Sequence, residues 1–143
     1  MPGPSLRQLH AHHAIHQGGL SGAVAKTEEV EELLEAKEFE VAHQAAEHLI
    51  EYWETRIISH ADAEEDGFYQ EMAGKNPNLQ DAVLGLTRDH ELLRIIVKDV
   101  KALLAEEGLT PEVLHQFHAL LVVNAIHSRD EERLLFEEAR PHF

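Results

Sequence analysis

The chain has 143 residues, of which 43% are hydrophobic and 27% charged, so we expect residues 1–143 to form a single globular domain with its own core. It contains no cysteine, which excludes disulfides, thiolate-bound zinc, iron–sulfur clusters and cysteine nucleophiles. The formal net charge of −15 argues against nucleic acid and anionic membranes as partners.

No apolar run in the sequence approaches the ~20 residues that a membrane-spanning helix needs. The first five residues, Met-Pro-Gly-Pro-Ser, lack the basic segment and the apolar segment of a secretory signal. The sequence therefore predicts a cytoplasmic protein.

Two helices are expected in the first half of the chain. One covers residues 5–35, with Ser5 as its N-cap and some loosening at the glycines between positions 18 and 22. The next covers residues 39–72 and ends at a break over residues 73–78 that contains Gly and Pro. The turn between them, near residues 36–38, has neither residue and is the boundary that the sequence marks least clearly.

Two more helices are expected in the second half, over residues 79–107 and from Pro111 to about Ala139. The break at residues 108–111 contains Gly and Pro, with Thr110 as N-cap and the proline at the first helical position. Short connections between long helices make neighbours antiparallel. The predicted fold is all-α, an antiparallel up-down-up-down four-helix bundle, and the following observations place a dinuclear metal site in its core.

The second and fourth helices share a motif. His60 precedes Glu64 in His-Ala-Asp-Ala-Glu-Glu, and His127 precedes Glu131 in His-Ser-Arg-Asp-Glu-Glu. A His and a Glu four residues apart lie one turn apart on one helix face, where both can bind one metal ion. Because the chain has 12 histidines, chance also produces such pairs, and helical geometry must separate the functional ones.

Helical phase places a subset of the histidines in the core. His60 and Glu64 continue the apolar stripe of their helix, and His90 continues that of residues 79–107. The stripe of the fourth helix contains Val113, Phe117, Leu120, Asn124, His127, Glu131 and Leu134. The residues predicted to lie outside the core are His43 with Glu47, His115, His118 and His142.

Distance from the turns places the inward histidines at one level. In two antiparallel helices, residues equidistant from the connecting turn lie at the same height. The midpoint of His60 and His90 falls in the break at residues 73–78, and that of His90 and His127 falls in the break at residues 108–111.

On the first helix, His13 and His16 both satisfy this test and both lie on the predicted inward stripe, so one or both are expected to reach the site. His10 and His12 flank that stripe and are expected to be exposed or to lie behind the ligands. The alternative is a bundle with a few hydrogen-bonded core histidines. Burying several imidazoles and two carboxylates without a cation would cost several kcal/mol, which favours the metal site.

Imidazole and carboxylate ligands without sulfur suit iron, manganese or zinc. Two carboxylates among four helices indicate two iron ions first, with manganese or zinc less favoured. The predicted metal ligands are His13, His16, His60, Glu64, His90, His127 and Glu131. Asn124, one turn before His127, is predicted to bind a ligand or water, the alternative being an ordinary buried amide. Trp53 is expected in the core, and Tyr52 and Tyr69 at the surface.

The set formed by a first-helix histidine, His60-x-x-x-Glu64, His90 and His127-x-x-x-Glu131 resembles the hemerythrin-like (HHE cation-binding) family, from about Leu6 to Phe136. The resemblance implies a non-haem di-iron centre in an up-down four-helix bundle. It implies that Glu64, Glu131 and an oxo or hydroxo group bridge the irons, with an open position for O2 or a related small molecule.

Two positions depart from the O2-carrying members of that family. Arg94 stands where carriers have a second histidine on the third helix, and carriers take their last carboxylate from the position of Glu132. The choice between Glu131 and Glu132 stays open at this point. Three functions are compatible with the sequence: storage or sensing of O2, nitric oxide or peroxide, which we prefer; a di-iron peroxidase or oxidase-like enzyme; and an iron-responsive interaction module.

Overall fold

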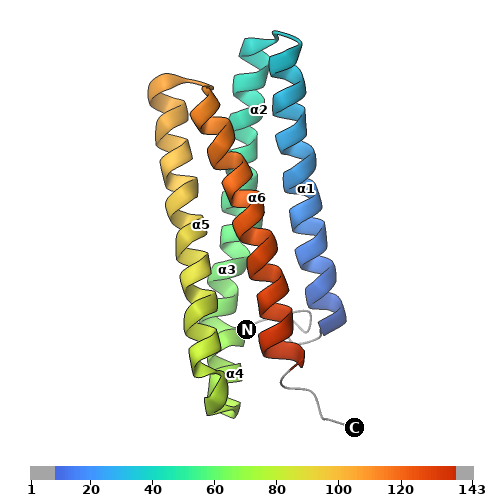
Figure 1. The fold of residues 1–143 in the computed structure, drawn as a ribbon, viewed down its shortest axis with the longest axis vertical. Coiled ribbons are helices and arrows are strands. Elements are labelled where there is room, and N and C mark those ends of the chain that lie inside the picture. Colours follow the sequence, from blue (N-terminus) through green and yellow to red (C-terminus); the bar gives the residue numbers. More distant parts are fainter. Residues whose placement is uncertain (1–8, 138–143) are drawn as a thin grey trace.

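The structure, a computed structural model, describes residues 9–137, and within this range every regular element is a helix. Four long helical segments lie side by side (Figure 1), which confirms the predicted all-α class. The first is α1 (Leu9–Glu35), the third is α5 (Gln80–Glu107), and the fourth begins with α6 (Pro111–Glu131). None of these described helices has the length and apolar character needed to cross a membrane.

The second segment changes its winding along its length. It consists of α2 (Phe39–Tyr52), the π-helical η2 (Trp53–Ile58), α3 (Ser59–Ala63), the π-helical η3 (Glu64–Phe68) and α4 (Tyr69–Lys75). A short 3₁₀ turn, η4 (Pro77–Leu79), then leads into α5, and a π-helical η5 (Glu132–Glu137) extends α6. Single π turns inside α-helices are rare and are frequent at functional sites.

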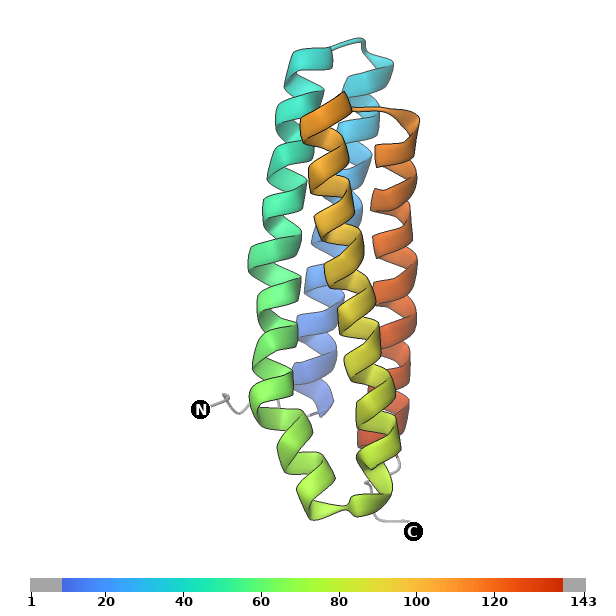
Figure 2. The same cartoon turned by 90° about the vertical axis from the view of Figure 1, so that its left-hand side faces the viewer.

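The chain connects these segments at alternating ends of the molecule. In Figures 1 and 2, α1 meets α2 at the upper end, α4 meets α5 at the lower end, and α5 meets α6 again at the upper end. The first turn lies at residues 36–38, as expected, and Lys37 adopts a positive φ of 62° there. Gly108 adopts a positive φ of 78° just after α5, a backbone conformation that favours glycine.

The helix ends follow the sequence signals. The Thr110 side chain accepts a hydrogen bond from the Val113 N–H, and Pro111 occupies the first turn of α6, as predicted. The predicted N-cap Ser5 lies outside the described residues. The α1 helix runs without interruption through Gly18, Gly19 and Gly22, so the expected loosening is absent.

The buried apolar residues form two clusters. The larger one contains Trp53, Leu93 and Leu120, and the smaller one contains Phe68 and Leu86 with others further towards the lower end. On the second and third helical segments the polar residues of the site come between the two clusters: His60 and Glu64 precede Phe68, and His90 lies between Leu86 and Leu93. The fold thus places a polar layer between two apolar layers.

Candidate metal centre

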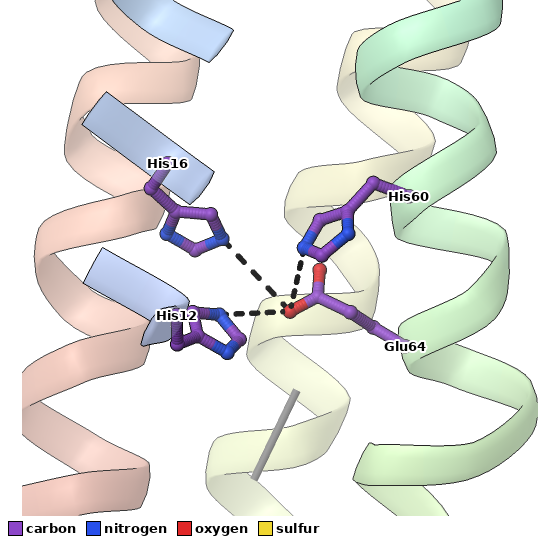
Figure 3. A group of neighbouring side chains, drawn as sticks. All are labelled: His12, His16, His60 and Glu64. Carbon is purple, nitrogen blue, oxygen red and sulfur yellow. Dashed lines mark ion pairs between the residues drawn. The ribbon is translucent and has the colours of Figure 1, made fainter. Parts of the chain in front are cut away.

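Seven buried or half-buried side chains from the four helical segments gather in this polar layer, in two overlapping groups. The three-histidine subsite contains His12, His16, His60 and Glu64, and the two-histidine subsite contains Glu64, His90, His127 and Glu131. Within each group the candidate ligand atoms all lie within 4.8 Å of one another. Figure 3 shows the first group, with His12 and His16 on α1 facing His60 and Glu64 across the bundle.

The Glu64 carboxylate has one oxygen in each subsite. Its Oε2 lies 3.1 Å from His12 Nε2, 3.9 Å from His16 Nε2 and 3.7 Å from His60 Nε2, the three approaches drawn in Figure 3. Its Oε1 lies 3.4 Å from His90 Nε2. A carboxylate oriented in this way can bind two cations at once.

Glu131 is oriented in the same way. Its Oε1 contacts the Nε2 of His12 and lies 3.2 Å from His16 Nε2, both in the three-histidine subsite. Its Oε2 lies 3.3 Å from His127 Nε2 and accepts a hydrogen bond from the Tyr69 hydroxyl. Both buried carboxylates therefore connect the two subsites.

The two-histidine subsite has outer hydrogen bonds that fix its imidazoles. His90 Nδ1 donates to Glu65 at 2.9 Å, and His127 Nδ1 donates to Asp89 at 3.0 Å. The two Nε2 atoms then face each other at 3.0 Å. This carboxylate–histidine pattern is the one that orients metal-binding imidazoles in proteins.

Three buried atoms of the cluster make no hydrogen bond within the described part of the chain. They are His16 Nδ1, His60 Nε2 and Glu64 Oε2, although imidazole nitrogens approach the last of these. A buried polar atom without a hydrogen bond costs about 1–3 kcal/mol. A cation in the three-histidine subsite would satisfy His60 Nε2 and Glu64 Oε2, so the residues present fit a metal ion there.

The pKa values of the histidines in the cluster shift in opposite directions. Burial lowers the pKa of His12, but hydrogen bonds to Glu131 and Glu64 outweigh it and raise that pKa to about 10. Burial likewise lowers the pKa of His127, and its bonds to Asp89 and Glu131 raise it to about 9. In the metal-free chain, protons on these two histidines balance the buried carboxylates.

The pKa values of the two other histidines with resolved shifts, and that of one carboxylate, are lowered. Burial lowers the pKa of His16 to about 3, and it also lowers the pKa of His60. Burial raises the pKa of Glu131, but its hydrogen bonds to His12 and His127 keep that pKa well below its ordinary value. His16 and His60 are therefore neutral near pH 7, the state in which imidazole binds metals.

Most of the predicted ligands meet in this cluster, namely His16, His60, Glu64, His90, His127 and Glu131. His13 does not: its side chain is 52% exposed, and its Nδ1 donates to Glu132 at 2.6 Å. His12, which the sequence analysis placed outside the inward stripe, is fully buried and takes that place. Adjacent residues on a helix point about 100° apart, so a phase error of one position exchanges the two histidines.

Glu131 rather than Glu132 is the carboxylate that reaches the cluster, which answers a question that the sequence left open. Arg94, at the position of the missing family histidine, forms ion pairs with Glu65 at 2.5 Å and Asp62 at 2.6 Å. Glu65 also accepts a hydrogen bond from His90, so Arg94 is connected to the cluster through the Glu65 carboxylate.

The expectation that Tyr69 lies at the surface was wrong. Its side chain is 1% exposed, and its hydroxyl lies 3.4 Å from His90 Nε2 as well as donating to Glu131. Phe68 and Phe136 stack at 5.4 Å between ring centroids, and the ring of His12 lies 5.0 Å from that of Phe136. These aromatic rings close the lower side of the cluster.

The other predictions for polar residues agree with the structure where it describes them. Asn124 is 7% exposed and lines a pocket beside the cluster, together with His60 and His127. His43 lies 3.8 Å from Glu47 with both side chains more than a third exposed, which confirms the pair as a surface feature. His115 and His118 are also exposed, whereas His10 and His142 lie outside the side chains that the structure describes.

Comparisons of the chain with protein-family models, with curated proteins and with solved structures gave no match. Five imidazoles and two shared carboxylates, buried between apolar layers, form a donor set suited to two borderline or hard transition-metal ions.

Proposed function

We propose that this protein is a hemerythrin-like non-haem di-iron protein that binds O2 or a related small ligand, such as nitric oxide or peroxide, for storage or sensing. The observation that carries the proposal is the orientation of Glu64 and Glu131, because each carboxylate offers one oxygen to each subsite. In the proposed centre, the four helical segments form an antiparallel up-down-up-down bundle around two bridged ions.

The ligand set favours iron. It combines imidazoles with carboxylates and has no thiolate, and dinuclear carboxylate sites in helical bundles are typically di-iron or di-manganese. When bound, a pair of iron ions supplies redox-active positions at which a small oxygen or nitrogen species can bind. Manganese and zinc fit the same donors less specifically.

The chain's own residues would shape the bound state. Glu65 and Asp89 hold the imidazoles of His90 and His127 in the required tautomer. The aromatic layer of Phe68 and Phe136 excludes water from the lower side of the cluster. Asn124 lines the pocket on the other side, where its amide can hydrogen-bond a small ligand.

A second candidate, an enzyme that removes peroxide or reactive nitrogen species, is favoured by one observation. The buried Tyr69 hydroxyl donates to Glu131 beside the two-histidine subsite, and a phenol is a side chain that can give up a proton and an electron.

The two candidates are separated by iron loading and optical spectroscopy. The chain is loaded with iron(II) without oxygen, its iron content is measured, and the spectrum is followed after exposure to O2 and again after degassing. Storage or sensing predicts about two irons per chain and a new visible band with O2 that disappears on degassing. Immediate conversion to a stable oxidised spectrum would favour the enzyme, and a folded chain that takes up no iron would refute both.

A further inference from the structure

A pocket leads from the surface to the cluster on the side opposite the aromatic layer. Its inner wall includes Glu64 and His90, which are almost completely buried, and its outer wall includes Arg56, which is exposed. Gly19 of α1 and Ile57 of η2 also line it. We call this the ligand pocket, and it connects solvent with both subsites.

The ligand pocket is small. Its cavity volume is about 30 Å³, and a cavity needs roughly 10–15 Å³ measured in this way to hold one water molecule. Species of two or three heavy atoms fit this space, and organic substrates do not.

Arg56 is the cationic group of the pocket wall. Within the described residues its guanidinium forms no hydrogen bond and no ion pair, unlike Arg94, which is held by two carboxylates. It lies over α1 at Gly18, where an added Cβ would be 3.4 Å from Arg56 Nη2. In a chain with a formal net charge of −15, an arginine with no ion-pair partner among the described residues supplies a positive charge at the pocket.

We propose that Arg56 selects small monoanions of two or three heavy atoms, the class that includes azide and nitrite, for passage through the ligand pocket to the metal centre. The inference rests on the proposed metal-binding function and names the ligand class of that site. The overall negative charge slows the approach of anions, and a positive charge on the pocket wall attracts them along this route. Neutral diatomic molecules gain nothing from Arg56.

The test compares an anion with a neutral ligand in the same metal-loaded protein. Binding of azide and of nitric oxide to the reduced, iron-loaded chain is followed by stopped-flow absorbance at low ionic strength, in wild type, Arg56→Gln and Arg56→Lys. We expect the azide association rate to fall roughly tenfold in Arg56→Gln and to be retained in Arg56→Lys. The nitric oxide rate stays unchanged in both, and added salt reduces the difference in azide rates.

A second pair of variants tests the route itself. Gly19→Leu fills the space towards Ile57, since a Cβ at Gly19 would lie 3.9 Å from that side chain, and should slow both ligands. Gly85→Leu is the matched control, because a Cβ there has no heavy atom within 4 Å. Both substitutions replace glycine within a helix, which favours folding.

The outcomes separate this inference from the proposed function. A wild-type chain that binds no metal would refute the proposed function. Metal-loaded variants whose azide rate is independent of residue 56, or whose azide and nitric oxide rates fall together in Arg56→Gln, would overturn anion selection alone. Unchanged azide and nitric oxide rates in Gly19→Leu would show that ligands reach the metals by another route. That result would also overturn anion selection by Arg56.

Discussion

The Nε2 atoms of His90 and His127 face each other at 3.0 Å, while the Nδ1 atoms of the same rings donate to Glu65 and Asp89. With their Nδ1 protons held by carboxylates, both rings turn nitrogen lone pairs towards the centre of the cluster. Two lone pairs at this distance need a cation between or beside them. In the metal-free chain that cation is a proton, and a metal ion can replace it.

The outer carboxylates should therefore control metal affinity. We predict that Asp89→Asn weakens metal binding by about 10- to 100-fold, because the amide is a poorer acceptor for His127 Nδ1–H and lowers the basicity of the imidazole. The affinity is measured by competition with a chelator of known strength. Asp99→Asn, an exposed position on the same helix, is the control, and equal affinities of the two variants would contradict the assignment.

The proposed bridging role of Glu131 can be tested against the neighbouring Glu132. Glu131 is fully buried and its oxygens serve both subsites, whereas Glu132 pairs with His13 outside the cluster. Glu131→Gln should reduce metal content from about two ions per chain to one or none, since both ions lose a charged ligand. Glu132→Gln should keep the wild-type content, and a loss of metal in this variant instead would assign the carboxylate to the wrong position.

The consecutive histidines His12 and His13 on α1 allow a second matched test of metal content. His12 is buried against Glu64 and Glu131, and His13 is half exposed. His12→Gln should empty the three-histidine subsite while leaving an ion in the other, and His13→Gln should leave both filled. Elemental analysis of the purified variants checks this, and the reverse pattern would restore the sequence-based choice of His13.

Much of this site could be predicted from the sequence because most of the helices have regular apolar stripes and clearly marked ends. The stripes of α5 and α6 are regular, so His90, His127 and Glu131 follow from their apolar neighbours. Gly108 and Thr110 mark a helix end and a helix start where the structure has them. Once those helix ends are known, the equal height of the histidines follows from the number of residues between each histidine and the connecting turn.

The side of α1 that faces the core could not be identified from the sequence in the same way. Small or polar residues fill its inward side, and the buried positions Gly19, Ala23, Thr27 and Val30 give a weak hydrophobic pattern. Extended backwards at intervals of three and four, these positions lead to His16 and then to His12. Extending the pattern from the far end of the helix is the signal that would have identified His12.

The π-helical turns also escaped prediction, because no residue type specifies them. Within η5, Leu135 is buried, whereas Leu134, which the sequence placed on the inward stripe, is only partly buried. The π turn of η3 precedes Phe68 and Tyr69, and both are buried beside the cluster. The position of Tyr69 therefore depends on a local change of winding that the sequence does not reveal.

The protonated histidines predict how metal binding depends on pH. The pKa values of about 10 for His12 and about 9 for His127 mean that both hold a proton near neutral pH in the metal-free chain. Metal ions must displace these protons, so affinity should rise as pH increases from 7 towards 9. Calorimetric titrations in buffers of different ionisation enthalpy should detect proton release, and a pH-independent affinity with no proton release would contradict the assignment.

The same shifts set the pH dependence of stability without metal. Both pKa values lie above the ordinary 6.5, so the stabilisation they give is complete below that pH and is lost as pH rises through about 9 to 10. Thermal unfolding of the metal-free chain should therefore show a falling midpoint over this range. His12→Gln should flatten the decline, and an unaltered decline in that variant would assign it to other groups.

The central claim is that Glu64 and Glu131 bridge two metal ions. The measurement that tests it most directly is the iron content of the loaded and oxidised wild-type chain together with its low-temperature Mössbauer spectrum in an applied field. We predict about two irons per chain, with their spins coupled through the bridge to a diamagnetic ground state. One iron per chain, or two irons with independent paramagnetic spectra, would contradict the bridged centre.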